Sequence, residues 1–271
     1  MRNAFQGRLG HPALPKRLIL SAAVVFALVL FVTLVPAPKR IDPSLTLVKE
    51  AGVLRVALDA SYPPFEVEYD GVFSGFDVDL AREIAGSMAV KVEFVNMGFD
   101  SLYDALLTRR ADAVISAFQY APEMTRDVAF STSYLTGGQV TVVAQGNTAI
   151  RDPSDMNGKR VAVERGSAAE SAAKKLLGKE SDVRIQGFPT SQEALDAVAA
   201  GQVDATIADF VEAAEFVRSK GGVQIVGKPL DPEPYVIAVR VRDQALLRAI
   251  ETALDQMRYD GRLDELRRHW F

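Results

Sequence analysis

ISAFQYAPEMTRDVAFSTS, residues 115–133, is the stretch that decides the fold of this 271-residue chain. It continues a short run of β-branched and small residues, Asp112–Ile115, which predicts a buried strand. The next residues, Ser116–Ala121, are predicted to form a turn, and Pro122 opens a helical turn at the position where a missing N–H costs least. A strand that leads into a helix start exposes backbone N–H groups, and open α/β sheets bind ligands there. We therefore expect the rest of the chain to close over this turn.

The residues before this stretch predict a parallel α/β unit. Strands are expected at Leu54–Leu58, Lys91–Val95 and Asp112–Ile115, with a helix in each interval. Asp77 and Asp100 are interpreted as N-caps of these helices, because a carboxylate accepts the free N–H groups of a helix start. Alternating strands and helices favour a parallel sheet with right-handed crossovers. The residues before the first strand, 41–47, are expected to be a tether.

The residues after the stretch repeat this layout without repeating its sequence. Strands are expected at Gln139–Ala144, Arg160–Val163, Val183–Gln186 and Asp204–Ile207, again separated by helices. Two crossings between the halves would make a hinge that absorbs a rigid-body closure. The expected division is a segment at 1–40, a first lobe at 41–133 plus 236–271, a second lobe at 139–230, and a hinge at 134–138 and 231–235.

Composition excludes several classes of function. The chain has no cysteine, which excludes disulfides, a thiol nucleophile and zinc–cysteine sites. Its two histidines, His11 and His269, lie near opposite ends, which argues against a Ser-His-Asp triad or a histidine metal cluster. Six of the 31 Lys and Arg residues lie in residues 1–40, which hold no acid, so residues 41–271 carry 25 bases against 35 acids and a net charge of −10. Nucleic acid is therefore a poor partner, and without a phosphate loop or dinucleotide glycine pattern we expect no cofactor and no metal.

An apolar segment precedes the globular part. Leu18–Val35 is an uncharged run of 18 residues between basic pairs, and its length fits a membrane span better than the core of a signal peptide. The small residues around Ala37 resemble a cleavage site, but Pro38 would follow the cut, so an uncleaved anchor is favoured over a cleaved signal. The basic residues before the run favour a cytoplasmic N-terminus. Under either interpretation, residues 41–271 lie outside the cytoplasm.

Several segments together resemble the family 3 extracytoplasmic solute-binding proteins that serve ABC importers of polar amino acids. The resemblance covers residues 50–271 and depends on the order and spacing of the segments rather than on one motif. It implies a type II periplasmic-binding-protein-like fold, with two α/β lobes joined by two hinge strands, a ligand between the lobes, and an ABC permease as partner. The segments are LRVALDASYPPFEV, GFDVDLAREIA, FDSLYDALLTRRADAVIS, PEMTRDVAFSTSYL, GKRVAVERGSAAE, GQVDATIADFVEAAEFV and ALDQMRYDGRLDELRRHWF.

The resemblance further implies a site for a zwitterion, whose amine is held by acids and whose side chain lies against aromatic rings. Asp209 and Asp59 match the amine-binding acids, although an N-cap and a turn-stabilising role are the structural alternatives. Tyr62, Phe65 and Phe99 match the aromatic wall, with core packing as their alternative. Both charges of a zwitterion lose water on closure, so each needs a charged or multiply hydrogen-bonded partner.

A turn in the second lobe, Gly166-Ser167-Ala168, matches the family's anion-binding turn. Glycine allows close approach, Ser167 offers a hydroxyl, and the helix start offers free N–H groups. A simple cap by Ser167 is the alternative. The full set of expected ligand-binding residues is Asp59, Tyr62, Phe65, Phe99, Ala117, Gln119, Met124, Arg165, Gly166, Ser167, Ala168 and Asp209.

The chain departs from the family pattern at one important position. The residue after Pro122-Glu123 is the arginine that pairs with the ligand carboxylate in the family, and here it is Met124, which cannot donate a hydrogen bond. Three explanations follow, in order of preference. The ligand is an amino acid whose carboxylate is held by Arg165, Gln119 and backbone donors; it is an amine or cationic solute without that carboxylate; or the binding function has drifted.

The function predicted from the sequence is capture of a small polar solute, an amino acid or a relative, by a monomer outside the membrane. We expect no catalysis. The alternatives are a periplasmic dehydratase acting on prephenate-like acids, in which Glu164, Glu66 or Asp209 would supply the acid or base, and a stand-alone ligand sensor on the same fold.

Overall fold

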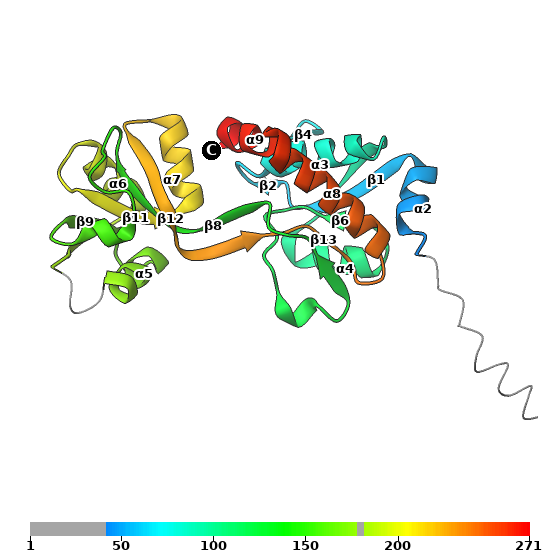
Figure 1. Ribbon diagram of the computed structural model, residues 1–271, viewed down its shortest axis with the longest axis horizontal. Coiled ribbons are helices and arrows are strands. Elements are labelled where there is room, and N and C mark those ends of the chain that lie inside the picture. Colours follow the sequence, from blue (N-terminus) through cyan, green and yellow to red (C-terminus); the bar gives the residue numbers. More distant parts are fainter. Residues whose placement is uncertain (1–41, 178–181) are drawn as a thin grey trace, which may run out of the picture. The chain divides into compact units, whose positions relative to one another are not determined.

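The computed structural model describes residues 42–177 and 182–271, and Asp42–Phe271 forms one compact unit. The apolar segment Leu18–Val35 lies outside the described residues, and within them no helix is both long and apolar enough to cross a membrane. Two five-stranded sheets, each covered by helices, make up this unit together with a small sheet of strands β2, β3 and β4 (Figure 1). The predicted two-lobed α/β fold is confirmed.

The first lobe contains a sheet with the strand order β5-β1-β6-β13-β7. Strand β1 lies between β5 and β6 and is parallel to both, as predicted, while β13 is antiparallel to β6 and β7. Both faces of this sheet are buried, because alternate residues of one strand enter different cores. Val56 of β1 belongs to one apolar cluster and Ala57 to another. The strands are β1 (Val53–Leu58), β5 (Lys91–Asn96), β6 (Ala113–Val114), β7 (Val128–Phe130) and β13 (Ala238–Arg240), and the small sheet is β2 (Ser61–Tyr62), β3 (Glu66–Tyr69) and β4 (Val72–Ser74).

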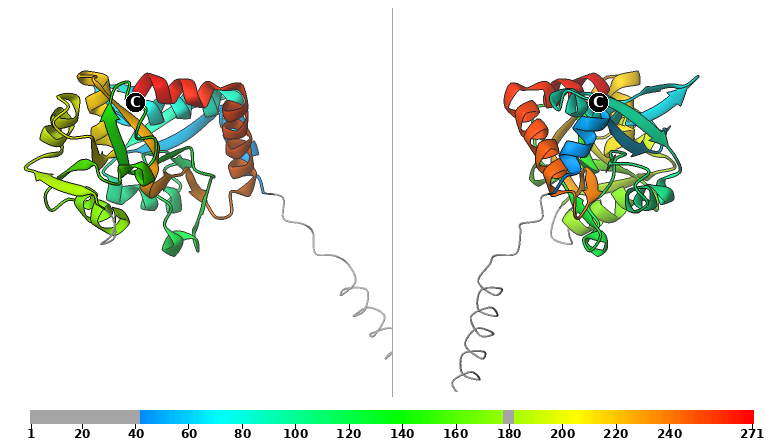
Figure 2. Two further views of the ribbon diagram at one scale, coloured as in Figure 1. Left: turned by 60° about the vertical axis from the view of Figure 1, so that its left-hand side comes forward. Right: turned by 90° about the vertical axis from the view of Figure 1, so that its right-hand side faces the viewer.

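Helices from both ends of the unit cover the first sheet. Helix α8 contacts α2 and α3, and α9 contacts α3 and α8; Figure 2 shows α2 in blue beside α8 in orange, with α9 in red. The helices of this lobe are α2 (Ser44–Ala51), α3 (Phe76–Ser87), α4 (Leu102–Leu107), α8 (Gln244–Asp260) and α9 (Arg262–Trp270), with short 3-10 turns η1 (Phe99–Ser101) and η2 (Pro122–Met124). Leu54, Leu80, Ile84, Ile250 and Leu254 form part of the fully buried core between these helices and the sheet.

The second lobe repeats this layout, with the strand order β10-β9-β11-β8-β12. Strand β9 is parallel to β10 and β11, and β8 is antiparallel to its neighbours β11 and β12. The predicted similarity of layout between the two halves is confirmed. The elements are β8 (Leu135–Ala144), η3 (Pro153–Met156), β9 (Arg160–Glu164), α5 (Ala168–Leu177), β10 (Arg184–Phe188), α6 (Ser191–Ala199), β11 (Ala205–Asp209), α7 (Phe210–Ser219) and β12 (Val223–Tyr235).

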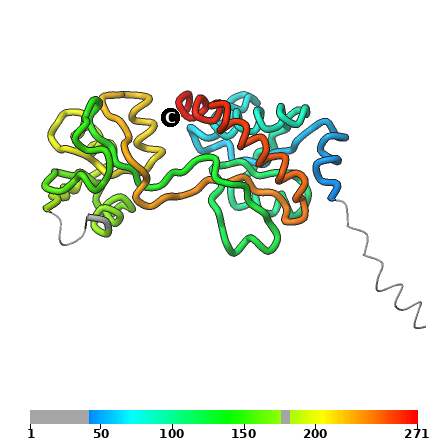
Figure 3. The backbone as a smooth tube through the Cα atoms, viewed as in Figure 1, coloured from blue at the N-terminus to red at the C-terminus, as the bar shows by residue number. Residues whose placement is uncertain are grey.

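Two long strands connect the lobes. Strands β8 and β12 pair in antiparallel fashion from Leu135↔Tyr235 to Gln139↔Asp231, and again beyond a bulge that lies between Val226 and Asp231. They run side by side in Figure 3, β8 in green and β12 in orange. Gly138 lies in this ladder at φ +97°, and a β-carbon there would collide with the carbonyl oxygen of Asp231. The pairing therefore requires glycine at this position.

Two local predictions are wrong. The expected tether at 41–47 contains the start of α2, and Asp42 and Ser44 accept hydrogen bonds from the N–H groups of Ala245 (2.5 Å) and Leu246 (3.1 Å). These are free donors of the first turn of α8, so the two side chains cap a helix about 200 residues away in sequence. Asp100 lies inside η1 and caps no helix.

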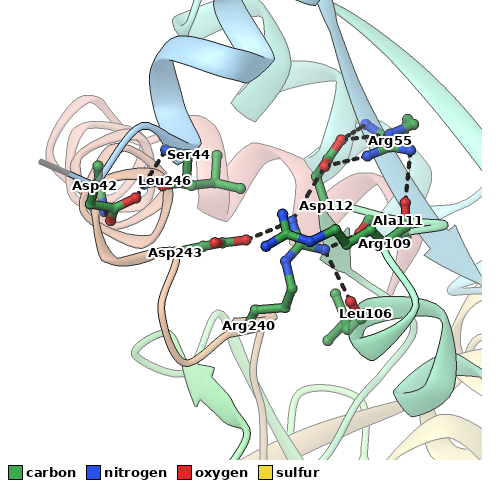
Figure 4. A network of polar contacts seen from close by, with 11 residues as sticks. Asp42, Ser44, Arg55, Leu106, Arg109, Ala111, Asp112, Arg240, Asp243 and Leu246 are labelled. Carbon is green, nitrogen blue, oxygen red and sulfur yellow. Dashed lines mark hydrogen bonds and ion pairs between the residues drawn. The ribbon is translucent and has the colours of Figure 1, made fainter. Parts of the chain in front are cut away.

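An ion-pair network holds the edge of the first lobe together (Figure 4). Arg55 binds Asp112 through two hydrogen bonds, Nη2 to Oδ1 at 2.7 Å and Nε to Oδ2 at 3.0 Å. Arg240 forms ion pairs with Asp243 at 2.5 Å and Asp112 at 3.5 Å and donates to the carbonyl oxygen of Ala111 at 2.6 Å. The Arg240 side chain is only 12% exposed and the side chains of both partner aspartates only 9%. A buried network of this kind is costly to break, because its remaining charges lose their partners.

We predict that Arg240→Met lowers the free energy of unfolding by about 3 kcal/mol or more, because it leaves two buried carboxylates without their shared cation. Chemical denaturation measures this change. The control is Arg218→Met, which breaks an ion pair with Glu215 whose side chains are 53% and 48% exposed, and should cost less than about 1 kcal/mol. Equal losses in the two variants would contradict the structural role of Arg240.

Candidate functional site

A cavity of about 400 Å³ opens where strands β1 and β6 end. In an open parallel sheet, ligands bind at the carboxyl ends of the strands, which is where the sequence placed the site. The residues that line the cavity are Asp59, Ser61, Tyr62, Glu66, Phe99, Ser116, Ala117, Gln119 and Tyr235. Five of the predicted ligand-binding residues are among them.

Asp59 is fixed in place by three hydrogen bonds. Its Oδ1 accepts from the Ser61 hydroxyl (2.7 Å), its Oδ2 accepts from the Phe99 N–H (2.8 Å), and its own N–H donates to Ser116 Oγ (3.0 Å). The carboxylate is thus preorganised at the end of β1, and each oxygen keeps acceptor capacity for a ligand. A negative charge held in this way is suited to bind a cation.

Two exposed aromatic rings stand beside Asp59. Tyr62 is 43% exposed and Phe99 48%, and both line the cavity. Phe65, by contrast, is fully buried: it stacks behind Tyr62 with 5.3 Å between ring centroids and packs against Phe76. The expectation that Phe65 belongs to the ligand-facing wall is therefore wrong, because the turn after Pro64 directs its ring into the core.

The turn after β6 connects the cavity to the strands between the lobes. The Gln119 side-chain amide donates to Glu233 Oε2 at 2.9 Å, and Gln119 forms an isolated β-bridge with Tyr235. Glu233 and Tyr235 belong to β12 and were not among the predicted site residues. No local pattern indicates them, since only the long-range pairing of β12 brings them to the cavity.

Met124 does not reach the cavity. It lies on η2 and packs against an apolar cluster that includes Phe118 and Val128, alongside the partly buried Met97 and Phe130. This correction has a simple physical reason, because a thioether gains more from apolar contact than from a polar cavity. The structure thus places an apolar side chain where the family resemblance implied an arginine.

The second lobe's turn is occupied by the chain itself. The Gly166 N–H donates to Glu170 Oε2 at 2.8 Å, and Ser167 Oγ accepts from the Glu170 N–H at 3.1 Å. Ser167 thus caps α5, and Glu170 accepts from the residue before that cap, so both side chains satisfy N–H groups at the start of the helix. Arg165 packs over Gly187, where any β-carbon would collide with its side chain. None of Arg165, Gly166, Ser167 and Ala168 lines the cavity.

Asp209 ends β11 and is the N-cap of α7, accepting from the N–H groups of Val211 (2.8 Å) and Glu212 (3.4 Å). Asp209 therefore has the N-cap role that the sequence analysis gave as its alternative. Its charge is nonetheless felt at the cavity: burial, and after it the negative charge of Asp209, raises the pKa of Tyr62. Asp209 itself is not among the residues that line the cavity.

Two buried acids lie beneath the cavity. Glu66 and Asp77 are both 0% exposed. Glu66 Oε1 accepts from the Ser116 hydroxyl at 2.6 Å, and Asp77 Oδ2 accepts from the Ala117 N–H and from the Tyr134 hydroxyl at 2.9 Å. Asp77 was predicted to be an N-cap, and this is wrong, since α3 begins at Phe76 and Asp77 points into the core.

Glu66 and Asp77 affect each other through their charges. Two of their oxygens, Glu66 Oε2 and Asp77 Oδ1, are buried with no hydrogen-bond partner among the described residues. Burial, and after it the charge of Asp77, raises the pKa of Glu66 to about 10, and burial raises the pKa of Asp77 to about 7. At least one of the two carboxyl groups therefore keeps its proton near neutral pH, because two buried like charges cannot both be ionised.

We predict that the free energy of unfolding falls as pH rises from about 6 to about 9. Both acids have folded-state pKa values above their ordinary ones, so the folded protein holds more protons than the unfolded chain in this range. The contribution of this pair to the free energy of unfolding is therefore complete below about pH 4 and is lost as pH rises through the folded-state pKa values. In Glu66→Gln the amide supplies the hydrogen bond without a proton to lose, and we expect the decline to shrink by more than about 1 kcal/mol.

Denaturation at several pH values measures this effect. Glu123→Gln, an exposed acid on η2, is the matched control and should leave the decline unchanged. A decline that Glu66→Gln leaves intact would show that the raised pKa values of Glu66 and Asp77 do not cause it.

Comparisons with known proteins define the class. Residues 54–271 match the bacterial extracellular solute-binding proteins, family 3, and the chain belongs to this family. It is therefore an extracytoplasmic solute-binding protein with the type II periplasmic-binding-protein fold.

One relative and two solved structures are especially similar to this chain. An L-arginine-binding protein of Pseudomonas aeruginosa is 32% identical over 228 residues, covering 80% of this chain and 87% of that protein. A solved structure of an ancestral cationic amino acid solute-binding protein is 36% identical with a TM-score of 0.62, covering 84% of this chain and 99% of that one. The structure of an ancestral cyclohexadienyl dehydratase is 29% identical with a TM-score of 0.75, covering 87% and 97%.

Proposed function

We propose that this protein captures a small, positively charged solute of the amino-acid class and delivers it to an ABC permease. The observation that carries the proposal is Asp59, whose carboxylate accepts two hydrogen bonds and whose N–H donates a third, in a cavity lined also by the exposed rings of Tyr62 and Phe99. Relatives named as binding arginine and cationic amino acids support a cationic ligand.

The proposed site combines residues of both lobes. From the first lobe come Asp59, Tyr62, Phe99 and Gln119, and from the second comes Asp209. A bound amine would exchange its water for the two carboxylates, and the aromatic rings would exclude solvent and add cation–π attraction. Each lobe supplies one acid, so a cation between them favours the conformation in which both acids reach it.

Closure of the lobes would signal that the site is filled. The paired strands β8 and β12 connect the lobes, and a few residues within such a connection can absorb a rigid-body rotation. The solute stabilises the closed form by its higher affinity for that form. The permease would then recognise the surface that closure brings together. Residues 134–138 and 231–235 are the proposed hinge.

The direct test is a solute screen. The full-length protein in mild detergent is heated with arginine, ornithine, glutamine, agmatine, putrescine or glutamate, and thermal unfolding is recorded. A solute present at 100 times its Kd should stabilise the folded protein by about 2.7 kcal/mol. We expect cations to stabilise and glutamate not to. Absence of a shift with every solute would refute the proposal.

We predict that Asp209→Asn lowers the affinity for a bound cation by about tenfold or more, since asparagine keeps the helix cap but removes the charge. Calorimetric titration gives the affinity, and denaturation checks that stability is preserved. Thr190→Ala is the matched control, because it removes the N-cap of α6, where Thr190 Oγ1 accepts from the Glu193 N–H at 3.2 Å. It should cost about 1 kcal/mol of stability and leave binding unchanged. Unchanged affinity in Asp209→Asn would remove Asp209 from the site.

The likeness to the ancestral dehydratase raises a second candidate, an enzyme for prephenate-like acids. Such a substrate carries carboxylates, which would meet Asp59, and Met124 offers them no positive charge. We therefore predict no release of phenylpyruvate from prephenate or of phenylalanine from arogenate above the uncatalysed rate. Measurable turnover that Glu66→Gln abolishes would establish the enzyme instead.

A further inference from the structure

The groups that bind a ligand's carboxylate in this family are replaced or already occupied in this chain. The first is the arginine position itself. Met124 stands there, and its side chain packs into the apolar cluster beside Phe118 and Val128. The cavity lining carries Asp59 and the protonated Glu66, and among the described residues that line it there is no Lys or Arg.

The second group is the turn before α5. Its Gly166 N–H, the donor that would face a ligand anion, is bound to the carboxylate of Glu170 at 2.8 Å. Lys174 pairs with the same carboxylate at 2.7 Å, and the charge of Arg165 acts on it as well. Lys174, then the Gly166 N–H, hold the pKa of Glu170 below its ordinary value. The anion that this turn is suited to bind is therefore a side chain of the protein.

The third group is Gln119. Its side-chain amide donates at 2.9 Å to Glu233, which belongs to β12. A carboxylate that approached this amide would also approach Glu233, and two like charges repel at such separations. The position therefore disfavours an anion.

The groups that would bind a cation remain in place. Asp59 is held at the cavity by three hydrogen bonds, and Asp209 and Glu233 both act on Tyr62. The exposed rings of Tyr62 and Phe99 add aromatic faces for an ammonium or guanidinium group. The site thus offers acids for a ligand's amine, but it lacks the arginine that would bind the carboxylate of a zwitterion.

We infer that the ligand is a small organic cation recognised through its amine or guanidinium group alone, with no α-carboxylate. Decarboxylated basic amino acids, the diamines and guanidinoamines, are the chemical class that fits. This inference rests on the proposed function, because it names the solute class for the same cavity. An α-carboxylate on the same cation would lose its water on closure and gain no charged partner, so it should weaken binding.

Two matched pairs of solutes test the inference. The full-length protein in mild detergent is titrated by calorimetry with arginine and agmatine, and with ornithine and putrescine. The members of each pair differ by the α-carboxylate alone. We expect the carboxylate-free member to bind about tenfold tighter or more in at least one pair, corresponding to about 1.4 kcal/mol.

A variant then supplies the missing arginine. Met124→Arg should shift the ratio of arginine to agmatine affinity toward arginine by about tenfold or more, because a charge-assisted pair replaces a thioether. Met124→Leu keeps the apolar packing and should leave the ratio unchanged. A ratio measured within one preparation does not depend on the fraction of folded protein, so partial misfolding of Met124→Arg would not obscure the result.

The outcomes separate the inference from the proposed function. If the amino acid binds at least as tightly as its decarboxylated partner in both pairs, the inference is wrong and solute capture stands. Binding of glutamine or glutamate alone overturns the inference and also the positive charge of the proposed solute, and leaves only capture of an amino-acid-class solute standing. Absence of binding by every solute refutes both.

Discussion

The buried pair of acids Glu66 and Asp77 makes the hydrogen bonds on which the site depends. Through Ser116 and Ala117 it fixes the turn that follows β6, and through Tyr134 it fixes the residue that precedes β8. Ser116 in turn accepts from the N–H of Asp59, so the ligand-facing carboxylate is attached to the same pair. One buried hydrogen-bond network therefore joins the cavity to the entry of the connecting strand. Its polar groups are desolvated, which makes each bond expensive to lose and the geometry well defined.

The electrostatics of the cavity follow from burial and from fixed dipoles more than from net charge. Glu66 is neutral because it lies beside Asp77 in a dry interior, so it adds no charge to the lining. Asp59 instead lines the cavity, where its carboxylate accepts hydrogen bonds from Ser61 and Phe99. Two acids within one cavity thus have different roles, and only the exposed one is suited to attract a cation. Glu170 matters for a related reason. Its carboxylate lies at the start of α5, where it competes with any anion of a ligand for the same N–H groups.

Most of the fold could be predicted from local pattern. Strands such as β1 and β9 have buried apolar residues on both faces, and helices such as α8 have regular apolar spacing, so both are visible without tertiary information. The parallel pairing of these strands was predicted from the alternation of strands and helices, whereas the strand order came from the structure. The site was only partly predictable. Asp59, Tyr62, Phe99 and Gln119 reach the cavity because strand ends meet there, whereas Glu233 and Tyr235 arrive through pairing of segments about 100 residues apart.

The amino-acid sequence alone was enough to identify the two α/β lobes, the family, and the replacement of the family's arginine by Met124, because each depends on residue types at fixed spacing. Only the tertiary structure decided which way side chains point and which donors are already used. It buried Phe65 behind Tyr62, turned Asp77 from a cap into a partner of Glu66, and gave the Gly166 N–H to Glu170. The physical reason is that hydrogen-bond satisfaction and burial are properties of the whole packed chain, and no local window of sequence contains them.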